Sequence, residues 1–333
     1  MSQVFAFALG LATTNSRGET LDCLFPMPCL RPTGAMAEAA AALDSGVSVI
    51  TPERAAEIAS ASGAALLPEV ALNADRPITA VRVDEDGPIG STAEAYLKLH
   101  LLSHRLTLPN TLNLDGIFAH LPNLAWTTAG PIAIDEVTDA ITAARVRGEH
   151  LEVMSVDKFP KMVNYVMPEG VRIADASRIR LGAYLGDGTT VMHEGFVNFN
   201  AGAIGPNMVE GRISQGVIID EGTDLGGSAS TMGTLSGGGE ITISLGKNCL
   251  VGANAGTGIP LGDRCTIEAG LYITAGTVVT IVDEHGETVR NAKARELAGG
   301  SDMLFIRNSQ TGEVLCRSNA RAIELNDALH SHN

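Results

Sequence analysis

Two side chains in the sequence could transfer a proton during catalysis. His193 stands in the sequence MHEG, and histidine is the residue type best suited to proton transfer at neutral pH. Glu210 stands in the sequence MVEGR, where its carboxylate could act as a base or as a nucleophile. Each also has a plain structural interpretation, His193 as a structural side chain and Glu210 as a solvated loop carboxylate beside Arg212. The residues alone leave these alternatives open.

Gly233 follows Thr231 and Met232 in a glycine-rich segment, and only glycine lets a backbone N–H approach a bound group closely. An ordinary loop glycine would have the same sequence. Zinc or disulfide chemistry is not predicted, because none of the five cysteines forms a CxxC pair.

The elements that position these residues follow a six-residue period after Pro168. Each unit is predicted to be a short strand plus a tight turn, and three units close one triangular coil. One residue of each unit points inward, and it is aliphatic at fourteen of sixteen positions and threonine at the other two. These positions are Ile173, Ile179, Leu185, Val191, Val197, Ile213, Ile219, Leu225, Thr231, Leu245, Val251, Thr257, Leu261, Ile267, Ile273 and Val279.

The period slips at two places, which we interpret as insertions between coils. They are residues 203–212 and residues 232–242, and the second is too glycine-rich to pack as core. Loops that project from a rigid β-helix are natural binding sites, and these two carry Glu210 and Gly233. The alternative is a β-rich domain with a chance periodicity.

The rest of the chain is predicted to form an α/β domain and a small C-terminal region. The domain boundaries are 1–168, 169–282 and 283–333. In the first domain we expect strands at 4–9, 112–119 and 151–156, and helices at 35–43, 52–61, 92–102 and 135–147. In the last we expect a hairpin of strands 303–307 and 313–317 and a helix at 319–330.

The composition of the chain indicates which kinds of binding partner are not expected. The net charge of −15 opposes binding to nucleic acid and to anionic membranes, so neither is an expected partner. Aromatic content is only 4% and there are 37 glycines, which suits a coil with small aliphatic residues inside and glycine at its turns. The N-terminus MSQVFAFALGLATTN has no basic segment and alternates like a strand, so a cytoplasmic location is expected.

Several segments together resemble the tetrahydrodipicolinate N-succinyltransferases, a family of hexapeptide-repeat acyltransferases. The resemblance covers most of residues 90–330, whereas the first 85 residues match less well. The segments are STAEAYLKLHLLSHRL, SVDKFPKMVNYVMPEGVRIADASRIRLGAYLGDGTTVMHEGFVNFNAG, MVEGRIS, TMGTLSGGG, GANAGTGIPLGD, EAGLYITAGT and FIRNSQTG.

The resemblance implies a fold, a reaction and roles for particular residues. The fold would be mainly β, a left-handed parallel β-helix after an α/β domain, assembled as a homotrimer with sites between subunits. The reaction would transfer a succinyl group from succinyl-CoA to the amino group of ring-opened tetrahydrodipicolinate. Glu210 matches the family's catalytic glutamate, as acyl-anhydride nucleophile or general base, and Gly233 matches the N–H that faces the oxyanion.

Further residues match positions of the family that contact substrate, CoA or metal. Arg212 could pair with the succinyl carboxylate, and Lys293 and Arg307 could meet the CoA phosphates. Glu194 matches one of two carboxylates that bind Mg²⁺ in some relatives, but Ser177 replaces the other. The contacting set is Arg212, Gly227, Ser230, Ala253, Glu268, Ala269, Gly276, Lys293, Ile306, Arg307, Asn308 and Ser309.

Other classes of β-helix protein have different sequence requirements. A carbonic anhydrase would need several histidines in the repeats, which contain only His193, and a nucleotidyltransferase would need a phosphate loop that residues 1–30 lack. An acetyl-CoA-dependent acyltransferase of another amine or hydroxyl acceptor stays open, and it could use His193 as its base. A non-catalytic scaffold would need neither the Glu210 nor the Gly233 loop.

Overall fold

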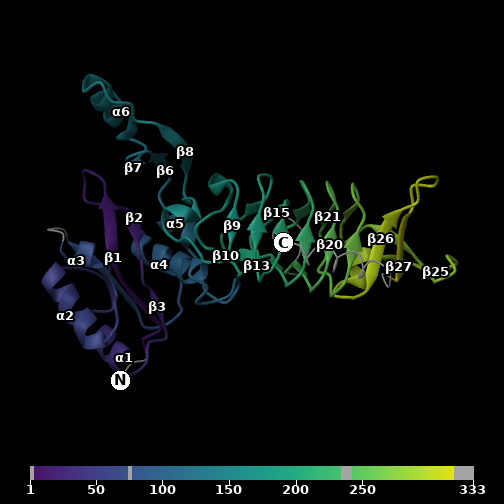
Figure 1. The fold of residues 1–333 in the computed structure, drawn as a ribbon, viewed down its shortest axis with the longest axis horizontal. Coiled ribbons are helices and arrows are strands. Elements are labelled where there is room, and N and C mark those ends of the chain that lie inside the picture. The colour runs from purple at the N-terminus through teal and green to yellow at the C-terminus, as the bar shows by residue number, and fades with distance from the viewer. Residues whose placement is uncertain (1–3, 74–76, 234–241, 319–333) are drawn as a thin grey trace. The chain divides into compact units, whose positions relative to one another are not determined.

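The computed structural model describes residues 4–73, 77–233 and 242–318. The chain forms two compact units, one of residues up to Thr107 with Thr111–Met167, the other of Leu108–Asn110 with the residues from Pro168 onward. Figure 1 traces both in sequence colours. The predicted three-part division of the chain stays a prediction, and the predicted helix at 319–330 lies outside the described residues.

The first unit is built on an antiparallel sheet of order β2-β1-β5-β4, with β3 also paired to β1. Helices α1 to α4 belong to the same unit. Side chains from the strands, such as Phe7, Leu9 and Ile78, pack with Ala55 and Ile58 of α2 in one hydrophobic core. The bounds are β1 Ala6–Thr14, β2 Thr20–Leu24, β3 Cys29–Leu30, α1 Gly34–Ala41, β4 Gly46–Ile50, α2 Pro52–Ser62, α3 Glu69–Leu72, β5 Ile78–Val83 and α4 Thr92–Ser103.

Capping residues explain where two of the predicted helices begin and end. The Thr51 hydroxyl accepts a hydrogen bond from the Arg54 N–H, and α2 ends at Gly63 with a φ of 70°. The Ser91 hydroxyl accepts from the Glu94 N–H at 3.1 Å and begins α4. Glu94 Oε2 in turn accepts from the Gly90 N–H at 3.0 Å, one residue before the partner it would have in a capping box.

The predicted strand at 112–119 is wrong. The segment forms a turn followed by the short helix α5 (Ile117–His120). Asn113 Oδ1 accepts from the Asp115 N–H at 2.9 Å, and Gly116 takes a φ of 84°. The local turn chemistry of these residues therefore prevails over their alternating apolar pattern.

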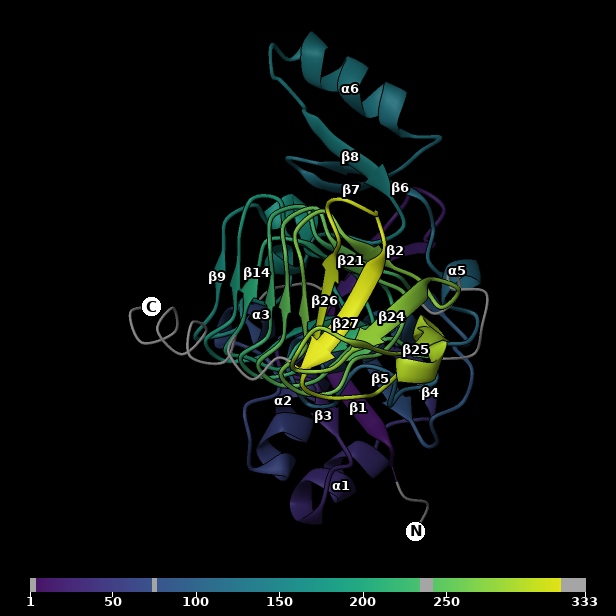
Figure 2. The same ribbon diagram turned by 90° about the vertical axis from the view of Figure 1, so that its right-hand side faces the viewer.

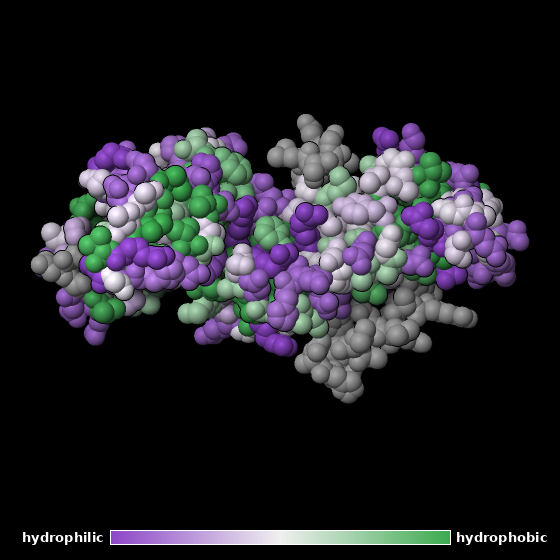
Figure 3. Space-filling view, turned by 90° about the horizontal axis from the view of Figure 1, so that it is seen from above, coloured by the Kyte–Doolittle hydropathy of each residue, from purple (hydrophilic) through white to green (hydrophobic). Residues whose placement is uncertain are grey.

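A small sheet of order β7-β6-β8 completes the first unit. Its edge strand β8 exposes Val153, Met154 and Val156, and Val146 of α6 is 83% exposed. Figure 3 shows apolar residues gathered on the surface of this unit. None of the four exposed side chains named here lines the pocket described below. The bounds are β6 Leu124–Thr127, β7 Gly130–Ala133, α6 Val137–Val146 and β8 Val153–Asp157, close to the predicted helix and strand.

The second unit is a stack of coils with three faces of parallel strands. Figure 2 looks along the stack, so that successive coils overlap as nested loops. The first face contains β10 Ala183–Leu185, β13 Ala201–Ala203, β16 Ile218–Ile219 and β19 Ser244–Leu245. The second face contains β9 Arg172–Ile173, β11 Thr190–Val191, β14 Met208–Val209, β17 Asp224–Leu225, β20 Leu250–Val251, β22 Thr266–Ile267 and β26 Met303–Arg307. The third face contains β12 Phe196–Val197, β15 Arg212–Ile213, β18 Ser230–Thr231, β21 Gly256–Thr257 and β23 Tyr272–Ile273.

The predicted inward positions form the core of this unit. Fifteen of the sixteen are at most 3% exposed, and only Ile173 is partly exposed. Because the same position recurs on every strand, aliphatic side chains stack on one another from coil to coil. The six-residue period is therefore confirmed as the determinant of the core.

The two inward threonines satisfy backbone groups where the coil is irregular. Thr231 Oγ1 donates to the Arg212 carbonyl at 3.0 Å and accepts from the Ser214 N–H at 3.2 Å. Thr257 Oγ1 donates to the Ile259 carbonyl at 2.8 Å and accepts from the Ile259 N–H at 3.2 Å. A hydroxyl is needed at these positions because buried backbone groups require partners.

The predicted insertion at 203–212 is wrong. Ala203 ends β13 and Val209 ends β14, and both strands pair with the coils on either side. The period continues through this segment, and the slip is a corner shortened to Glu210 and Gly211 between β14 and β15. At the other slip, residues 232–243 separate β18 from β19, and most of that segment lies outside the described residues.

A hairpin closes the C-terminal end, as predicted. Strand β26 pairs antiparallel with β27 (Val314–Ser318) and parallel with β22, so the hairpin continues the second face. Strands β24 (Val278–Val282) and β25 (Thr288–Lys293) extend the same sheet beyond β27.

Candidate active site

The candidate residues gather along one edge of the coil stack, where the second face turns into the third. We call it the glycine edge, because each of its five corners between residues 192 and 271 contains a glycine. Four corners have four residues, but the corner of Glu210 and Gly211 has only two, which leaves a recess between its neighbours. The corners are 192–195, 210–211, 226–229, 252–255 and 268–271.

Close packing at the recess requires glycine. A Cβ added to Gly211 would lie 2.4 Å from the Ala229 carbonyl oxygen. A Cβ on Gly195 would lie 2.4 Å from the Val209 carbonyl oxygen. Neither neighbour is a flexible side-chain end, so the short corner can form only with glycine at these positions.

Two carboxylates converge on the recess. A Cβ placed on Gly227 would be 3.4 Å from Glu194 Oε2 and 3.7 Å from Glu210 Oε2, so both oxygens lie over the same glycine. The Glu210 backbone is fixed, since its N–H donates to the Leu225 carbonyl at 2.8 Å. Glu210 is half-buried and Glu194 exposed, which keeps both carboxylates accessible to a substrate.

Ser228 connects the two glutamates. Its N–H donates to the Glu210 carbonyl at 3.1 Å, and its hydroxyl donates to Glu194 Oε2 at 2.9 Å. Ser228 adopts a φ of 59°, a conformation that is uncommon for a residue other than glycine. The corner thus holds the backbone of Glu210 and the side chain of Glu194 in one arrangement.

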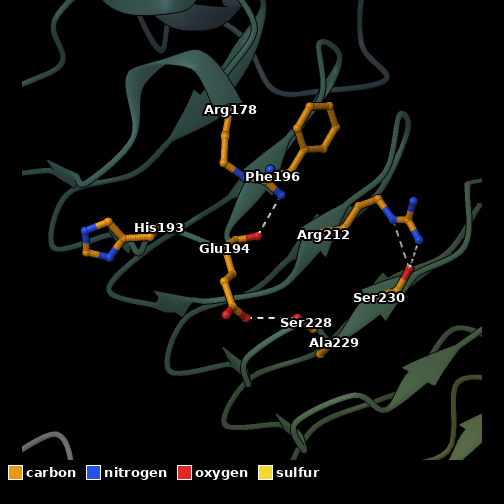
Figure 4. Close-up of a pocket in the computed structure, with 8 residues that line it drawn as sticks. All are labelled: Arg178, His193, Glu194, Phe196, Arg212, Ser228, Ala229 and Ser230. Atoms are coloured by element: carbon orange, nitrogen blue, oxygen red, sulfur yellow. Dashed lines mark hydrogen bonds between the residues drawn. The ribbon is translucent and has the colours of Figure 1, made fainter.

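A column of side chains on the third face forms the wall next to this recess. Phe196, Arg212 and Ser230 occupy the same register on neighbouring strands. Arg212 Nε and Nη2 donate to Ser230 Oγ at 3.1 and 3.0 Å, as Figure 4 shows. The pocket has a volume of about 620 Å³ and is lined by Arg178, His193, Glu194, Phe196, Arg212, Ser228, Ala229 and Ser230.

His193, the rival base, lines the same pocket but faces away from its arginine wall. The residue is exposed, and Figure 4 shows its ring turned away from Arg212 and Ser230. Arg178, Phe196 and Ser228 were not among the sequence-predicted site residues. A signal for two of them exists in the repeat, because Arg178 and Phe196 precede inward residues just as Arg212 and Ser230 do.

The predicted CoA-contacting residues follow farther along the glycine edge. The Asn254 N–H donates to the Gly227 carbonyl at 2.9 Å, and the Gly270 N–H donates to the Ala253 carbonyl at 2.8 Å. The residues Gly227, Ala253 and Ala269 therefore lie on successive corners along the glycine edge. Gly276 lies beyond β23, and a Cβ there would meet nothing within 4 Å.

The C-terminal hairpin meets this line at Glu268. Glu268 Oε2 accepts from the Arg307 N–H at 2.7 Å, which ties the corner to the end of β26. Ile306 lies in the same strand, and the next residues form a turn in which Asn308 Oδ1 accepts from the N–H groups of Gln310 and Thr311 at 2.9 and 3.2 Å. Ser309 is exposed in this turn, and Lys293 is exposed at the end of β25.

Gly233 is placed two residues after β18, half-buried. The glycine-rich residues that follow it, 234–241, lie outside the described residues. The pairing of Gly233 with Glu210 of another chain stays a prediction.

The residues around Glu194 do not fit a magnesium site within one chain. The Glu194 carboxylate accepts from Ser228, and the Ser177 hydroxyl donates to Asp175 Oδ1 at 2.6 Å. In the described part of the chain, no three His, Cys, Asp or Glu side chains form a group that could hold a metal ion. No catalytic step is therefore assigned to a metal.

Two family profiles match the chain. The profile described as the hexapeptide repeat of succinyl-transferase matches residues 242–275. The profile described as the middle region of tetrahydrodipicolinate N-succinyltransferase matches residues 121–161. Across the described ranges, no helix has both the length and the apolar character needed to cross a membrane.

Full-length relatives carry the same name. The chain is 54% identical over 345 residues to the 2,3,4,5-tetrahydropyridine-2,6-dicarboxylate N-succinyltransferase of Pseudomonas aeruginosa, with 100% of both chains covered. It is 51% identical to the enzyme of that name from Vibrio cholerae, with 99% of both covered. A Campylobacter jejuni crystal structure, described as a 2,3,4,5-tetrahydropyridine-2-carboxylate N-succinyltransferase, has a TM-score of 0.85 and 30% identity, covering 97% of this chain and 94% of that one.

Proposed function

The chain belongs to the tetrahydrodipicolinate N-succinyltransferase family, and we propose that the recess at Glu210 is where it performs the reaction of that family. The enzyme transfers a succinyl group from succinyl-CoA to the amino group of ring-opened tetrahydrodipicolinate, a step of diaminopimelate and lysine biosynthesis. The observation that carries the site assignment is the convergence of Glu210 and Glu194 over Gly227, because Glu194 also lines the pocket that contains Arg212.

Succinyl-CoA lies along the glycine edge in this proposal. Arg212, held by Ser230, receives the free carboxylate of the succinyl group, because a guanidinium can bind a carboxylate through two parallel hydrogen bonds. The corners of Gly227, Ala253 and Ala269 contact the pantetheine arm. The phosphates are met by Arg307 and Lys293, which are exposed at the C-terminal end of the unit.

Glu210 carries the proton or the acyl group. As a general base it takes a proton from the substrate ammonium, whose nitrogen then attacks the thioester carbon and expels the CoA thiolate. As a nucleophile it attacks the same carbon first, forming an anhydride and releasing the thiolate, and the amine then displaces Glu210 to form the amide. In both routes the Gly233 N–H donates to the oxyanion of the tetrahedral intermediate.

The assembly and the cell location also belong to this proposal. The coils wind as a left-handed β-helix, three chains form a homotrimer, and Gly233 of one chain completes the recess of its neighbour. The enzyme works in the cytoplasm, where succinyl-CoA is made. Light scattering tests the trimer, since one chain has a mass of 34.6 kDa and the expected particle has three times that mass.

The activity is tested by measuring CoA release from succinyl-CoA and acetyl-CoA, each with and without tetrahydrodipicolinate. Rapid release is expected only when succinyl-CoA and tetrahydrodipicolinate are both present. Preference for acetyl-CoA with another amine or hydroxyl acceptor would support a different acyltransferase. Absence of release with every acceptor would support a scaffold and overturn the proposal.

A further inference from the structure

One end of the pocket contains a cation that the proposed donor site does not use. Arg178 precedes Ile179, which bridges to Val197, so Arg178 continues the column of Phe196, Arg212 and Ser230 by one coil. Adjacent strands lie about 4.8 Å apart, so the two arginines are separated by roughly 10 Å with Phe196 between them. Figure 4 shows the phenyl ring between these two side chains.

Arg178 is held in place without losing its charge. Nε donates to the Gly195 carbonyl and Nη2 to the Glu194 carbonyl, both at 2.9 Å. These acceptors are backbone oxygens, and the nearby Asp175 carboxylate, whose pKa is lowered mainly by its hydrogen bonds from Ser177, feels the Arg178 charge only as a weaker effect. The guanidinium is therefore a rigid positive group at the wall of the pocket.

The ring of Phe196 adds an apolar surface beside this charge. It is half-buried, and the guanidinium carbon of Arg180 lies 6.0 Å from its centroid. A ligand that fits this end of the pocket has a carboxylate for Arg178 and a short methylene chain for Phe196. Its opposite end would then reach toward Glu194 and Glu210, which lie on the two following corners of the glycine edge.

We propose that Arg178 and Phe196 bind the end of the acceptor that is remote from its amino group. This inference rests on the proposed function and deepens it. The remote carboxylate of the seven-carbon acceptor pairs with Arg178, its methylenes lie on Phe196, and its amine is thereby presented to Glu210. Arg178 thus selects acceptors with a second carboxylate at the far end of the chain, while Arg212 serves the acyl donor.

The test uses Arg178→Gln, with Arg172→Gln as the matched control, because Arg172 is exposed, precedes the inward Ile173 on the second face and does not line the pocket. In Arg178→Gln the KM for tetrahydrodipicolinate should rise about 10- to 100-fold, because a charge-assisted hydrogen bond is lost. The KM for succinyl-CoA should stay within about twofold of the wild-type value, whereas the melting temperature should fall, because the two carbonyl contacts are lost. Arg172→Gln should leave both KM values unchanged.

A structural role for Arg178 would have a different signature. Loss of its two carbonyl contacts would then raise the KM values for both substrates together, and that result would overturn the proposal. An unchanged KM for the acceptor would overturn it as well. Arg178→Lys separates the roles further, because it restores the charge without the two-carbonyl clamp and should recover part of the acceptor affinity.

Binding of pimelate, an unreactive seven-carbon dicarboxylate, distinguishes this inference from the proposed function. Calorimetric titration should detect pimelate binding to the wild-type chain and about tenfold weaker binding to Arg178→Gln. Pimelate binding that depends on Arg178, without turnover of any donor, would contradict only the proposed function. Normal wild-type turnover with equal pimelate binding by both proteins would contradict only the role of Arg178.

Discussion

Arg212 and Ser230 lie opposite each other on adjacent parallel strands, and the arginine donates to the serine hydroxyl through both Nε and Nη2. Ser230 is only 8% exposed, so its hydroxyl is a fixed acceptor. The contact orients the guanidinium within the pocket. The positions of the two residues in the repeat, each just before an inward residue, bring them together.

Ser230→Ala is expected to weaken use of succinyl-CoA. Without the hydroxyl, Arg212 loses its orientation, and the KM for succinyl-CoA should rise about 3- to 10-fold, in line with roughly 1 kcal/mol for a hydrogen bond. The KM for the acceptor should change little. Ser244→Ala is the matched control, because Ser244 precedes the inward Leu245 on the first face, outside the pocket. Equal effects of the two substitutions would contradict the assigned role of Ser230.

Glu210→Gln is expected to lower kcat about 10²- to 10⁴-fold, the usual range for losing a proton-transfer group. Folding and assembly should be unaffected, because the backbone contacts of Glu210 remain. Steady-state kinetics and light scattering check both statements. Glu221→Gln, at an exposed corner outside the pocket, serves as the control. Near-normal turnover of Glu210→Gln together with an inactive His193→Ala would transfer the role to His193.

Gly211→Ala is expected to disrupt the short corner. The new Cβ would lie 2.4 Å from the Ala229 carbonyl oxygen, so the backbone must move. Overpacking of this kind costs about 1–3 kcal/mol, and the shift displaces Glu210 as well. Thermal unfolding should show a lower melting temperature, and kcat should fall. Gly87→Ala is the control, since a Cβ there meets nothing within 4 Å, and it should behave like the wild type.

Thr257→Val is expected to destabilise the coil although it adds an apolar group to the core. The Ile259 N–H and carbonyl would both lose the Thr257 hydroxyl as partner, and Ile259 is 2% exposed. A buried backbone group left without a partner costs about 1–3 kcal/mol. Chemical denaturation measures the loss. Val251→Thr is the comparison, because Val251 is an inward residue without such backbone contacts, and this substitution should also destabilise the coil. A Thr257→Val protein as stable as the wild type would refute this account.

The stability of the first unit is expected to fall in mild acid. His100 is fully buried, and burial lowers its pKa to about 3, while Nδ1 donates to the Tyr96 carbonyl and Nε2 accepts from the Phe25 N–H. Burial also lowers the pKa of the neighbouring His104. With an ordinary pKa near 6.5, the unfolded chain binds more protons between about pH 6.5 and 3.

The free energy of unfolding should therefore decrease as the pH falls through that window, by up to about 1.4 kcal/mol per pH unit for His100. Denaturant titrations at pH 7.5, 6 and 5 measure the slope. In His100→Gln the slope should be smaller, whereas His150→Gln should keep it, because His150 is exposed. A slope that is identical in all three proteins would rule out His100 as its source.

The coils and the ends of α2 and α4 could be predicted from the residues alone, because these features depend on local chemistry. Aliphatic residues at a six-residue spacing can all point inward only in a triangular coil, and Thr51, Pro52 and Gly63 fix α2 through contacts within a few residues. The same locality explains one error, since the turn at Asn113 to Gly116 overrides an apolar alternation that resembles a strand.

The meaning of the slip at 203–212, and which side chains meet there, follows only from the pairing of strands between coils. Ala203 is too small to stand out in the pattern, and a corner of two residues cannot be distinguished from an insertion until β14 is paired with β11 and β17. Glu194, Glu210 and Ser228 come from three different corners, so their convergence depends on strand pairing between coils. That pairing is a long-range property, and no local pattern in the sequence encodes it.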